Sequence, residues 1–581
     1  MKEIHAWKDL KEPFSNLRSE IDLRSNPLSF FNQSGKRIAG FYDRLDSSSP
    51  SKGVVIIVPA YGKTKISNLP LAYYLALDGF QVIRYDHTDH VGESEGNMLF
   101  TTLSQMEEDL RSAIDFAEGE FLTSRIALVS SSLGVRVALK EATKDKRVKL
   151  LISLVGVFNL QGTLYAIYRE DGVQEVLDGA SLGVRDIMGF QVDADHFLKD
   201  AIQGNFHSLE TSLQDVAELS IPTVFFAGDK DPWVSFDEVR MVFNQIPTIQ
   251  KELYVLPNIM HEIYENPVLA DFTCRKIVAS TEKYLVGKEP GWDTIKTPEE
   301  SVLVNRFREE KVRSSKELNP EEEKKFWKRY LEKYAHIVNL QDYWNLLNFL
   351  NQLLGNWRRG EKLLDAGCGI GNFGTFVLVR HLYSLMQGRA FPFKRLPFAH
   401  YVGVDFVDEA IQQAAKTHAE IQKELKGKTG FWLNSPNLVN YIYTILDLNR
   451  SLPFRNQCFD KICCNLVLSY LSDPLYTLKE LFRTLKIGGR IVVTSLKPYA
   501  DLSQIYRDFI QVSRTPEELA QARIVLNNAG MIIHKEAEGY YQFLSQVELE
   551  NFLAEVGANN IQTFRSFGDQ ANVAVADKFG L

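Results

Sequence analysis

The sequence has little cysteine, no long apolar run and no excess of basic charge. Five cysteines among 581 residues, none spaced as a metal-binding set, predict a reducing compartment without structural disulfides. No apolar run approaches the roughly 18 residues that cross a bilayer, and the first residues lack the apolar stretch of a signal peptide. The formal net charge of -8 offers no broad basic field for nucleic acid. We therefore expect a cytoplasmic protein with no stable membrane insertion, no nucleic-acid partner and no bound metal.

What the sequence does contain is two series of short apolar runs that alternate with helical patterns. A chain of 581 residues exceeds what one hydrophobic core usually serves. Alternating strands and helices predict parallel sheets covered by helices on both faces. In the first series we expect an early hairpin near 28–42, a loop at 47–51, and strands at 54–58, 81–86, 126–129, 148–155, 223–226 and 251–256. In the second series we expect strands at 362–365, 401–405, 442–446, 461–465, 490–495, 560–565 and 572–576.

Two segments interrupt this rhythm. Residues 157–220 carry polar turns and helical pieces, predicted at 163–168 and 184–189, and are interpreted as a cap inserted over the sheet edge. Residues 289–325 are densely charged and are interpreted as a solvated linker or surface helix. The sequence thus predicts an α/β domain over 1–288, a charged linker over 289–325, and a second α/β domain over 326–581.

The stretch Ile126–Leu139 organises the first half. It is predicted to run from a buried strand through a sharp turn into a helix, with Ser132 at the apex. A nucleophile elbow needs small residues two before and two after its nucleophile, and Ser130 and Gly134 stand there. Read alone, the same residues could be a serine-rich helix N-cap.

The rest of the first half supplies partners for a serine nucleophile. A serine hydroxyl needs a base to accept its proton and an acid to orient that base. In chain order, Asp231 follows the strand at 223–226 and His261 follows the strand at 251–256, with Asp229 as an alternative acid. An oxyanion hole would use the Leu133 amide, directly after the nucleophile, and the amide of Tyr61, or alternatively Ala60, in the turn after the strand at 54–58.

A loop beneath this predicted site contains two histidines. His87 and His90 lie in the run D-H-T-D-H-V-G-E-S-E-G. They could be metal ligands, but His90 with Gly92 and Ser94 is better explained as a structural turn.

These segments together resemble a known enzyme family. The runs R-Y-D-H-T-D-H-V-G-E-S-E-G, S-S-S-L-G-V-R-V-A, V-G-V-F-N-L-Q-G-T-L and D-K-D-P-W-V, followed by N-I-M-H-E, resemble the acyl-ACP thioesterase (acyltransferase) of bacterial bioluminescence operons. The resemblance covers about 25–285 and implies an α/β-hydrolase fold. It implies that Ser132, with Asp231 and His261, accepts a long-chain acyl group from an acyl-carrier-protein or CoA thioester. Gly134 departs from that family and is closer to general hydrolases.

A glycine-rich turn organises the second half. Asp365, Gly367, Gly369 and Gly371 lie in K-L-L-D-A-G-C-G-I-G-N-F, where glycines let the backbone approach a ligand closely. A lone turn of this kind could also bind a dinucleotide.

Later features make the second half similar to class I S-adenosylmethionine-dependent methyltransferases. The turn matches the motif D-x-G-C-G-x-G, and the tract S-L-P-F to F-D with the following I-C-C-N strand matches the family's central strand. The resemblance covers about 325–581 and implies a Rossmann-like fold and S-adenosyl-L-methionine as cofactor. It places Asp405 at the ribose hydroxyls and Asp447 at the adenine. Tyr334 and His336 are candidates for contact with the methyl acceptor, although such aromatic residues more often belong to the core.

The sequence therefore predicts a bifunctional enzyme. One domain would cleave or transfer an acyl group, and the other would methylate an acyl-derived or related small-molecule or lipid acceptor, with a fatty acid methyl ester as one product. Two alternatives remain, namely a general carboxylesterase fused to an independent methyltransferase and a chain in which one domain is a non-catalytic binding module.

Overall fold

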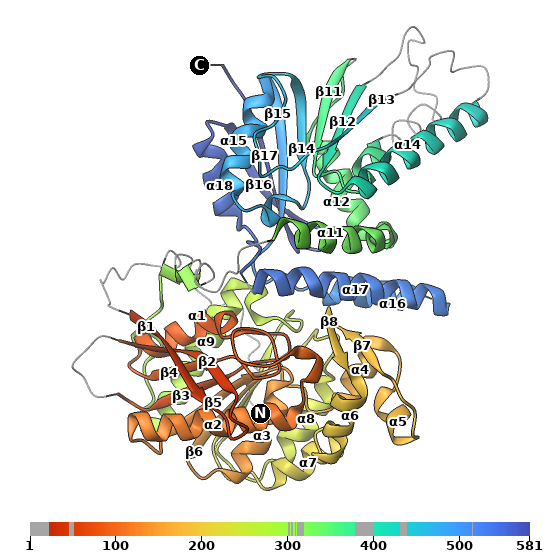
Figure 1. The fold of residues 1–581 in the computed structure, drawn as a ribbon. Helices are drawn as coiled ribbons and strands as arrows, with labels where there is room; N and C mark the ends of the chain where they lie inside the picture. The colour runs from red at the N-terminus through yellow and green to blue at the C-terminus, as the bar shows by residue number, and fades with distance from the viewer. Residues whose placement is uncertain are drawn as a thin grey trace. The chain divides into compact units, whose positions relative to one another are not determined.

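The computed structural model describes residues 23–45, 51–299, parts of 302–310, 319–377 except 359, 399–429, and 439–580 except 514 and 538. The chain divides into two compact units (Figure 1). The first unit consists of Met1–Ser315 with Ala529–Gly539, and the second of Lys316–Asn528 with Tyr540–Leu581. Most of the loop expected at 47–51 lies outside the described residues.

An eight-stranded sheet forms the centre of the first unit, in the order β1-β2-β4-β3-β5-β6-β9-β10. β1 and β2 form an antiparallel hairpin, β2 is antiparallel to β4, and the remaining neighbours are parallel. The strands are β1 (Leu23–Phe31), β2 (Arg37–Leu45), β3 (Val54–Val58), β4 (Gln81–Tyr85), β5 (Ile126–Ser131), β6 (Val148–Leu154), β9 (Thr223–Gly228) and β10 (Lys251–Leu256). The early hairpin and all six later strands predicted for this half are confirmed.

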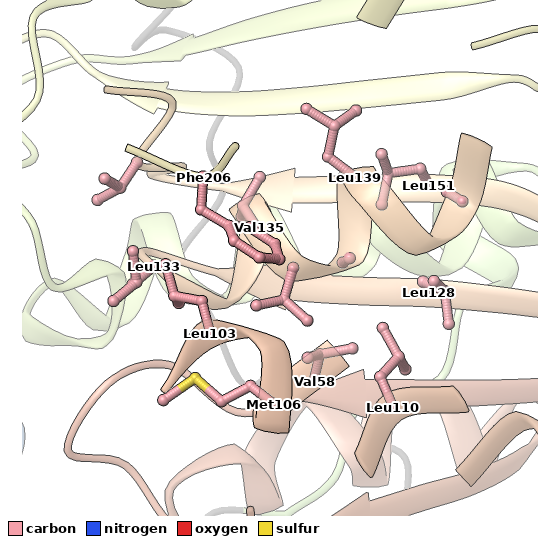
Figure 2. Packing of buried hydrophobic residues seen from close by; sticks show 14 of the residues in the cluster. Val58, Leu103, Met106, Leu110, Leu128, Leu133, Val135, Leu139, Leu151 and Phe206 are labelled. Carbon is pink, nitrogen blue, oxygen red and sulfur yellow. The ribbon is translucent and has the colours of Figure 1, made fainter. Parts of the chain in front are cut away.

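Helices bury both faces of this sheet. The inner strands are continuous apolar runs because both of their faces are covered. On one face pack α2 (Leu103–Phe121), α3 (Gly134–Lys144), α7 (Leu209–Ala217) and α8 (Phe236–Gln245), and on the other α1 (Leu69–Leu77) and α9 (Pro267–Thr281). Figure 2 shows the first of these cores, where Leu103, Met106 and Leu110 of α2 approach side chains of α3 and of the strands. This packing holds the end of β5, where the elbow begins.

The cap contains a hairpin that was predicted as helix. After α4 (Leu160–Tyr168) and α5 (Gly172–Leu177), the chain forms β7 (Val184–Ile187) and β8 (Phe190–Asp193), then α6 (Ala194–Gln203). The expectation of a helical piece at 184–189 is wrong. Met188 and Gly189 both have positive φ, 52° and 94°, which is the backbone of a tight two-residue hairpin turn.

Part of the segment expected as a solvated linker is buried in the first unit. Glu310 is 1% exposed and accepts hydrogen bonds from both terminal nitrogens of Arg84, at 3.1 and 2.9 Å. The Arg84 guanidinium also donates to Asp43, at 2.6 and 2.9 Å. The expectation of solvation therefore fails at Glu310, because its charge is matched by a buried arginine on β4. Of the densest charged run, 308–325, residues 308 and 311–318 lie outside the described residues, and the last six residues begin the helix α11 (Pro320–Tyr334).

A seven-stranded sheet forms the second unit, in the order β13-β12-β11-β14-β15-β17-β16. All neighbours are parallel except β17, which runs antiparallel to both β15 and β16. The strands are β11 (Glu361–Ala366), β12 (Ala399–Asp405), β13 (Val439–Ile445), β14 (Phe459–Cys464), β15 (Leu485–Leu496), β16 (Asn559–Ser566) and β17 (Ala571–Asp577). All seven were predicted.

Among the described residues, the helices of this part of the chain are α11 (Pro320–Tyr334), α12 (Gln341–Leu353), α14 (Asp408–Thr429), α15 (Pro474–Thr484), α16 (Ser503–Val512), α17 (Pro516–Ala537) and α18 (Gln546–Glu555). The end of α17, from Ala529, belongs to the first unit. The predicted fold class, an α/β-hydrolase-like unit followed by a Rossmann-like unit, is confirmed. Among the described residues, no helix combines the length and apolar character required to cross a membrane.

Candidate active sites

Ser132 lies on a strained turn between β5 and α3. Its φ is 51°, in the left-handed region that non-glycine residues seldom occupy. The turn is tight because Gly134 passes close to the neighbouring strand, and a Cβ at Gly134 would lie 2.5 Å from the Pro59 carbonyl oxygen and 2.7 Å from Ser130 Oγ. The requirement for small residues on both sides of Ser132 thus has a steric cause.

The structure brings together the three side chains that the sequence grouped. Ser132 Oγ lies 2.8 Å from His261 Nε2, and His261 Nδ1 lies 2.7 Å from Asp231 Oδ2. The other carboxylate oxygen of Asp231 accepts the backbone N–H groups of Trp233 and Val234 at 3.0 and 3.1 Å. These bonds hold Asp231 in one orientation beside His261. The arrangement can relay a proton away from the serine hydroxyl.

The alternative acid has a different partner. Asp229 accepts the Asn258 backbone N–H at 2.6 Å and so ties the end of β9 to the loop that carries His261. Its carboxylate positions that loop and is not the one paired with the imidazole.

Two backbone amides near Ser132 have no partner. Within the part of the chain that the structure describes, the amides of Tyr61 and Leu133 donate to no other group. By the same criterion the amide of Ala60, the alternative residue, also donates to no described group, while its carbonyl accepts the Lys63 N–H at 3.1 Å. Backbone N–H donors left without a partner beside a nucleophile suit an anionic oxygen.

The histidine loop after β4 packs against this turn. His90 Nε2 accepts the Gly62 backbone N–H at 3.2 Å, and His87 Nδ1 lies 3.5 Å from Asp109. Among the residues described, no group of three or more His, Cys, Asp or Glu side chains could hold a metal ion. Sequence reasoning missed the role of His90 because its partner is a backbone amide in another loop.

In the second unit, the glycine turn follows β11 and is linked to β12. Gly367, Gly369 and Gly371 all have positive φ, at 76°, 52° and 84°. The Gly369 N–H donates to Asp405 at 2.9 Å, and the other oxygen of Asp405 accepts the Val407 N–H at 3.0 Å. Four of the predicted residues therefore lie together at the carboxyl edge of the sheet.

Asp365 and Asp447 differ in their surroundings. Asp365 is buried and accepts the Tyr401 hydroxyl, whereas Asp447 follows β13, is partly exposed and accepts the Asn449 N–H at 2.9 Å. Burial raises the pKa of Asp365 to about 7, although the hydrogen bond from Tyr401 opposes the shift. Burial likewise raises the pKa of Asp405, against the backbone N–H groups that favour its charge.

The raised pKa of Asp365 predicts that the stability of the folded chain depends on pH. The folded chain keeps a proton on Asp365 between about pH 4, where an unfolded Asp titrates, and about pH 7. The folded state then binds more protons than the unfolded state, so this residue's contribution to the free energy of unfolding falls as pH rises across that window. We expect Asp365→Asn to remove that fall in chemical denaturation curves. Burial lowers the pKa of His418 to about 4, so this residue makes the free energy of unfolding rise with pH. It does so equally in the wild type and in Asp365→Asn, and its effect therefore cancels when the two proteins are compared. Identical pH slopes would contradict the prediction.

His418 is a site residue that the sequence did not reveal. It lies on α14, with Nε2 at 2.9 Å from the Gly371 carbonyl oxygen and 3.0 Å from Thr375 Oγ1. Because burial lowers its pKa, the ring is neutral at neutral pH and one nitrogen can donate to that carbonyl. No local motif marks a histidine 47 residues beyond the glycine that it contacts.

Aromatic side chains of α11 lie near the glycine turn. Trp327, Tyr330 and Tyr334 pack around a small apolar cluster with Leu331, and a Cβ on Gly369 would lie 3.3 Å from Leu331. The ring of Trp327 is 4.9 Å from that of Tyr470, which follows β14. Tyr334 is partly exposed within this group, while His336 lies in the turn Ala335–Asn339 that follows α11. These aromatic side chains adjoin the turn expected to bind the methyl donor.

Comparison with known proteins gives each half a family. A family model described as an acyl transferase matches residues 44–285, and one described as a methyltransferase domain matches residues 358–541. The acyl transferase of Photobacterium leiognathi is 30% identical over 268 residues, covering 44% of this chain and 84% of that protein. The acyl transferase of Photobacterium phosphoreum is 29% identical over 263 residues, covering 44% and 85%. An esterase structure from Pyrococcus furiosus covers 45% of this chain and 93% of its own, with 16% identity and a TM-score of 0.35.

Proposed function

The chain belongs to the acyl transferase family through its first half and carries a methyltransferase domain in its second, and on this basis we propose the reactions that it performs. The first domain takes a long-chain acyl group from an acyl-carrier-protein or CoA thioester through an ester on Ser132. The second domain uses S-adenosyl-L-methionine to methylate an acyl-derived or related small-molecule acceptor. The observation that carries the first proposal is the relay of Ser132, His261 and Asp231 beside two free amides.

The geometry supports a two-step acyl transfer. Ser132 Oγ attacks the thioester carbonyl while His261 Nε2 takes the hydroxyl proton, and Asp231 stabilises the resulting imidazolium. The Tyr61 and Leu133 amides donate to the oxyanion of the tetrahedral intermediate. As the intermediate collapses, the C–S bond breaks and His261 returns the proton to the departing thiolate. Water or another acceptor then attacks the Ser132 ester, releasing the acyl group and restoring the serine.

The two carboxylates after β9 give a matched test of this relay. We expect Asp231→Asn to lower kcat for acyl release on the order of 10⁴-fold, because the imidazole loses its oriented tautomer and the stabilisation of its charge. Asp229→Asn removes a carboxylate two residues away that is hydrogen-bonded to the His261 loop and not to the imidazole, so we expect a much smaller loss. Steady-state kinetics on a long-chain acyl thioester measure both. Equal losses in the two variants would argue against Asp231 as the acid.

The residues at the glycine turn fit the proposed methyl donor. Turn residues with positive φ leave room for the amino-acid portion of S-adenosyl-L-methionine, Asp405 would hold its ribose hydroxyls, and Asp447 would contact its adenine. When bound, the cofactor supplies a methyl group on a sulfonium. In-line transfer from a sulfonium can proceed by positioning alone, and the aromatic side chains of α11 are suited to orient an apolar acceptor. Isothermal titration with S-adenosyl-L-methionine, comparing the wild type with Asp405→Ala, tests the donor site.

The two activities can act in sequence on one acyl group. Released acid would become a methyl ester if its carboxylate is the acceptor, and tethering the two domains raises the local concentration of that acid. The test incubates long-chain acyl-ACP with a methyl-labelled donor and separates the lipid products. Labelled lipid supports the sequence, whereas free acid without label leaves two independent activities.

The runner-up function is a general carboxylesterase fused to an independent methyltransferase. Gly134, which is typical of general hydrolases, is the observation that favours it. Measuring kcat/KM over a series of acyl thioesters and short-chain esters distinguishes the two functions. An acyl transferase of this family is expected to prefer long-chain thioesters. A non-catalytic first domain would show no labelling of Ser132 by a fluorophosphonate.

A further inference from the structure

The turn that carries the Tyr61 amide is bonded to a buried histidine. Gly62, the next residue, donates its backbone N–H to His90 Nε2 at 3.2 Å. His90 is 6% exposed and lies in the loop after β4, 28 residues beyond Gly62. The bond therefore joins the turn after β3 to the loop after the neighbouring strand. The Gly62 N–H lies in the peptide plane on the C-terminal side of Tyr61, so this bond fixes one of the two planes that flank Tyr61 and restricts how its backbone can rotate.

For this bond to form, the imidazole of His90 must be neutral with a free lone pair on Nε2. Burial, together with the neighbouring His87, holds the pKa of His90 well below its usual range. The ring centroids of the two histidines lie 6.0 Å apart. At neutral pH His90 is therefore an acceptor at Nε2 and carries its single proton on Nδ1.

The cap hairpin holds the side chain of Tyr61 from the other direction. The Tyr61 hydroxyl donates to the Ile187 carbonyl oxygen of β7 at 3.2 Å. The Tyr61 ring meets the ring of Phe190, at the start of β8, edge to face with centroids 5.7 Å apart and planes at 90°. It also meets His90 edge to face at 5.7 Å. Tyr61 is thus held at its ring by the hairpin and at its backbone by His90.

We propose that His90 is a positioning residue for the oxyanion hole, which holds the Tyr61 amide in the direction where charge develops during attack by Ser132. This inference rests on the proposed acyl transfer. The cap hairpin completes the support through Ile187 and Phe190. A preorganised donor stabilises the transition state without reorganising during the reaction, so the gain depends on how firmly its turn is held. His90 acts through Gly62 and Tyr61 and does not touch the reacting atoms.

Two substitutions at His90 separate this role from simple packing. His90→Leu fills similar space but leaves the Gly62 N–H without an acceptor, whereas His90→Gln offers a side-chain oxygen that can accept it. The readouts are kcat and KM for a long-chain acyl thioester, and the inhibition constant of a long-chain alkyl trifluoromethyl ketone, whose adduct with a serine carries the oxyanion. Thermal unfolding of each variant reports on packing.

We expect His90→Leu to lower kcat about 10-fold to 100-fold, less than the loss from deleting an oxyanion donor. The inhibition constant of the ketone for His90→Leu should rise by a similar factor, while KM stays nearly unchanged. His90→Gln should recover most of the lost kcat and most of the lost affinity for the ketone. Tyr61→Phe removes the hydrogen bond to Ile187 and keeps the backbone amide, so its kcat should fall several-fold at most. The proposal is overturned if His90→Leu keeps full activity, if kcat falls without weaker ketone binding, or if both His90 variants lose activity and thermal stability alike.

The wild-type chain and Ser132→Ala distinguish failure of this inference from failure of the proposed function. If Ser132→Ala still cleaves the thioester, the acyl-transfer mechanism itself is wrong. If Ser132 is required but His90→Leu is indistinguishable from wild type, only the role of His90 is rejected.

Discussion

Replacing Ser132 by alanine should lower kcat for acyl release by about 10⁴-fold or more. The hydroxyl forms the covalent bond to the acyl group, and removing one member of a catalytic relay removes most of what the whole relay contributes. The Tyr61 and Leu133 amides remain, so substrate affinity should change little. Single-turnover assays with a labelled acyl thioester measure the loss, and mass spectrometry should find the acyl adduct on Ser132 only in the wild type.

The neighbouring serine provides the control. Ser131 ends β5, directly before the nucleophile, and lacks the short contact to His261. Ser131→Ala should retain activity within a few-fold. Methyl transfer to a supplied acceptor should be unchanged in Ser132→Ala, because the glycine turn belongs to the other unit. An acyl adduct on another residue would refute the assignment of the nucleophile.

Replacing Gly367 by alanine should abolish most binding of S-adenosyl-L-methionine, with an affinity about 100-fold weaker. A Cβ at this position would lie 2.4 Å from a methyl group of Val467, so the turn or the segment after β14 has to shift. The residue also has a φ of 76°, which costs a non-glycine residue about 1–2 kcal/mol. A displaced turn loses its close contacts with the cofactor, and a loss of about 100-fold in affinity corresponds to about 2.8 kcal/mol of binding free energy. Isothermal titration measures the affinity, and acyl release should be unaffected.

Gly557 offers a control with the same backbone strain and no steric contact. Its φ is 81°, and a Cβ there would meet no atom within 4 Å. Gly557→Ala should lower thermal stability slightly and leave cofactor affinity as in the wild type. If both variants bind the cofactor normally, the glycine turn is not its binding site.

The central strands were predictable because they are buried on both faces. β3 has the predicted bounds, since it is a short apolar run that is buried throughout. β10, at the edge of the sheet, also has the predicted bounds, although it begins with two charged residues and is only partly buried. The hairpin of β7 and β8 was missed because β7 is largely exposed and carries no alternating apolar pattern. Its turn, Met188–Gly189, was the available local signal, and it was overlooked.

Within the sites, residues in local motifs were predictable and residues with distant partners were not. Ser132 and Gly367 lie in short runs whose spacing reflects a steric requirement within a few residues. His90 and His418 each accept from or contact a backbone group in another loop or element, and such pairs form only when the sheets assemble. Spacing favours Asp231, which matches the pattern G-x-x-D-x-x-V, over the alternative Asp229. The directions of the carboxylates agree with that choice, since Asp231 pairs with His261 whereas Asp229 accepts from Asn258.

The buried group of Arg84, Asp43 and Glu310 determines how the gene can be divided for separate expression. A first fragment that stops at residue 288, where the strand pattern ends, would omit Glu310 and leave half of the Arg84 guanidinium facing an empty position inside the protein. Removing one partner of a buried ion pair is costly, at about 3–5 kcal/mol. A fragment meant to fold alone should therefore extend past Glu310, so the sequence between the two enzymes is partly a component of the first.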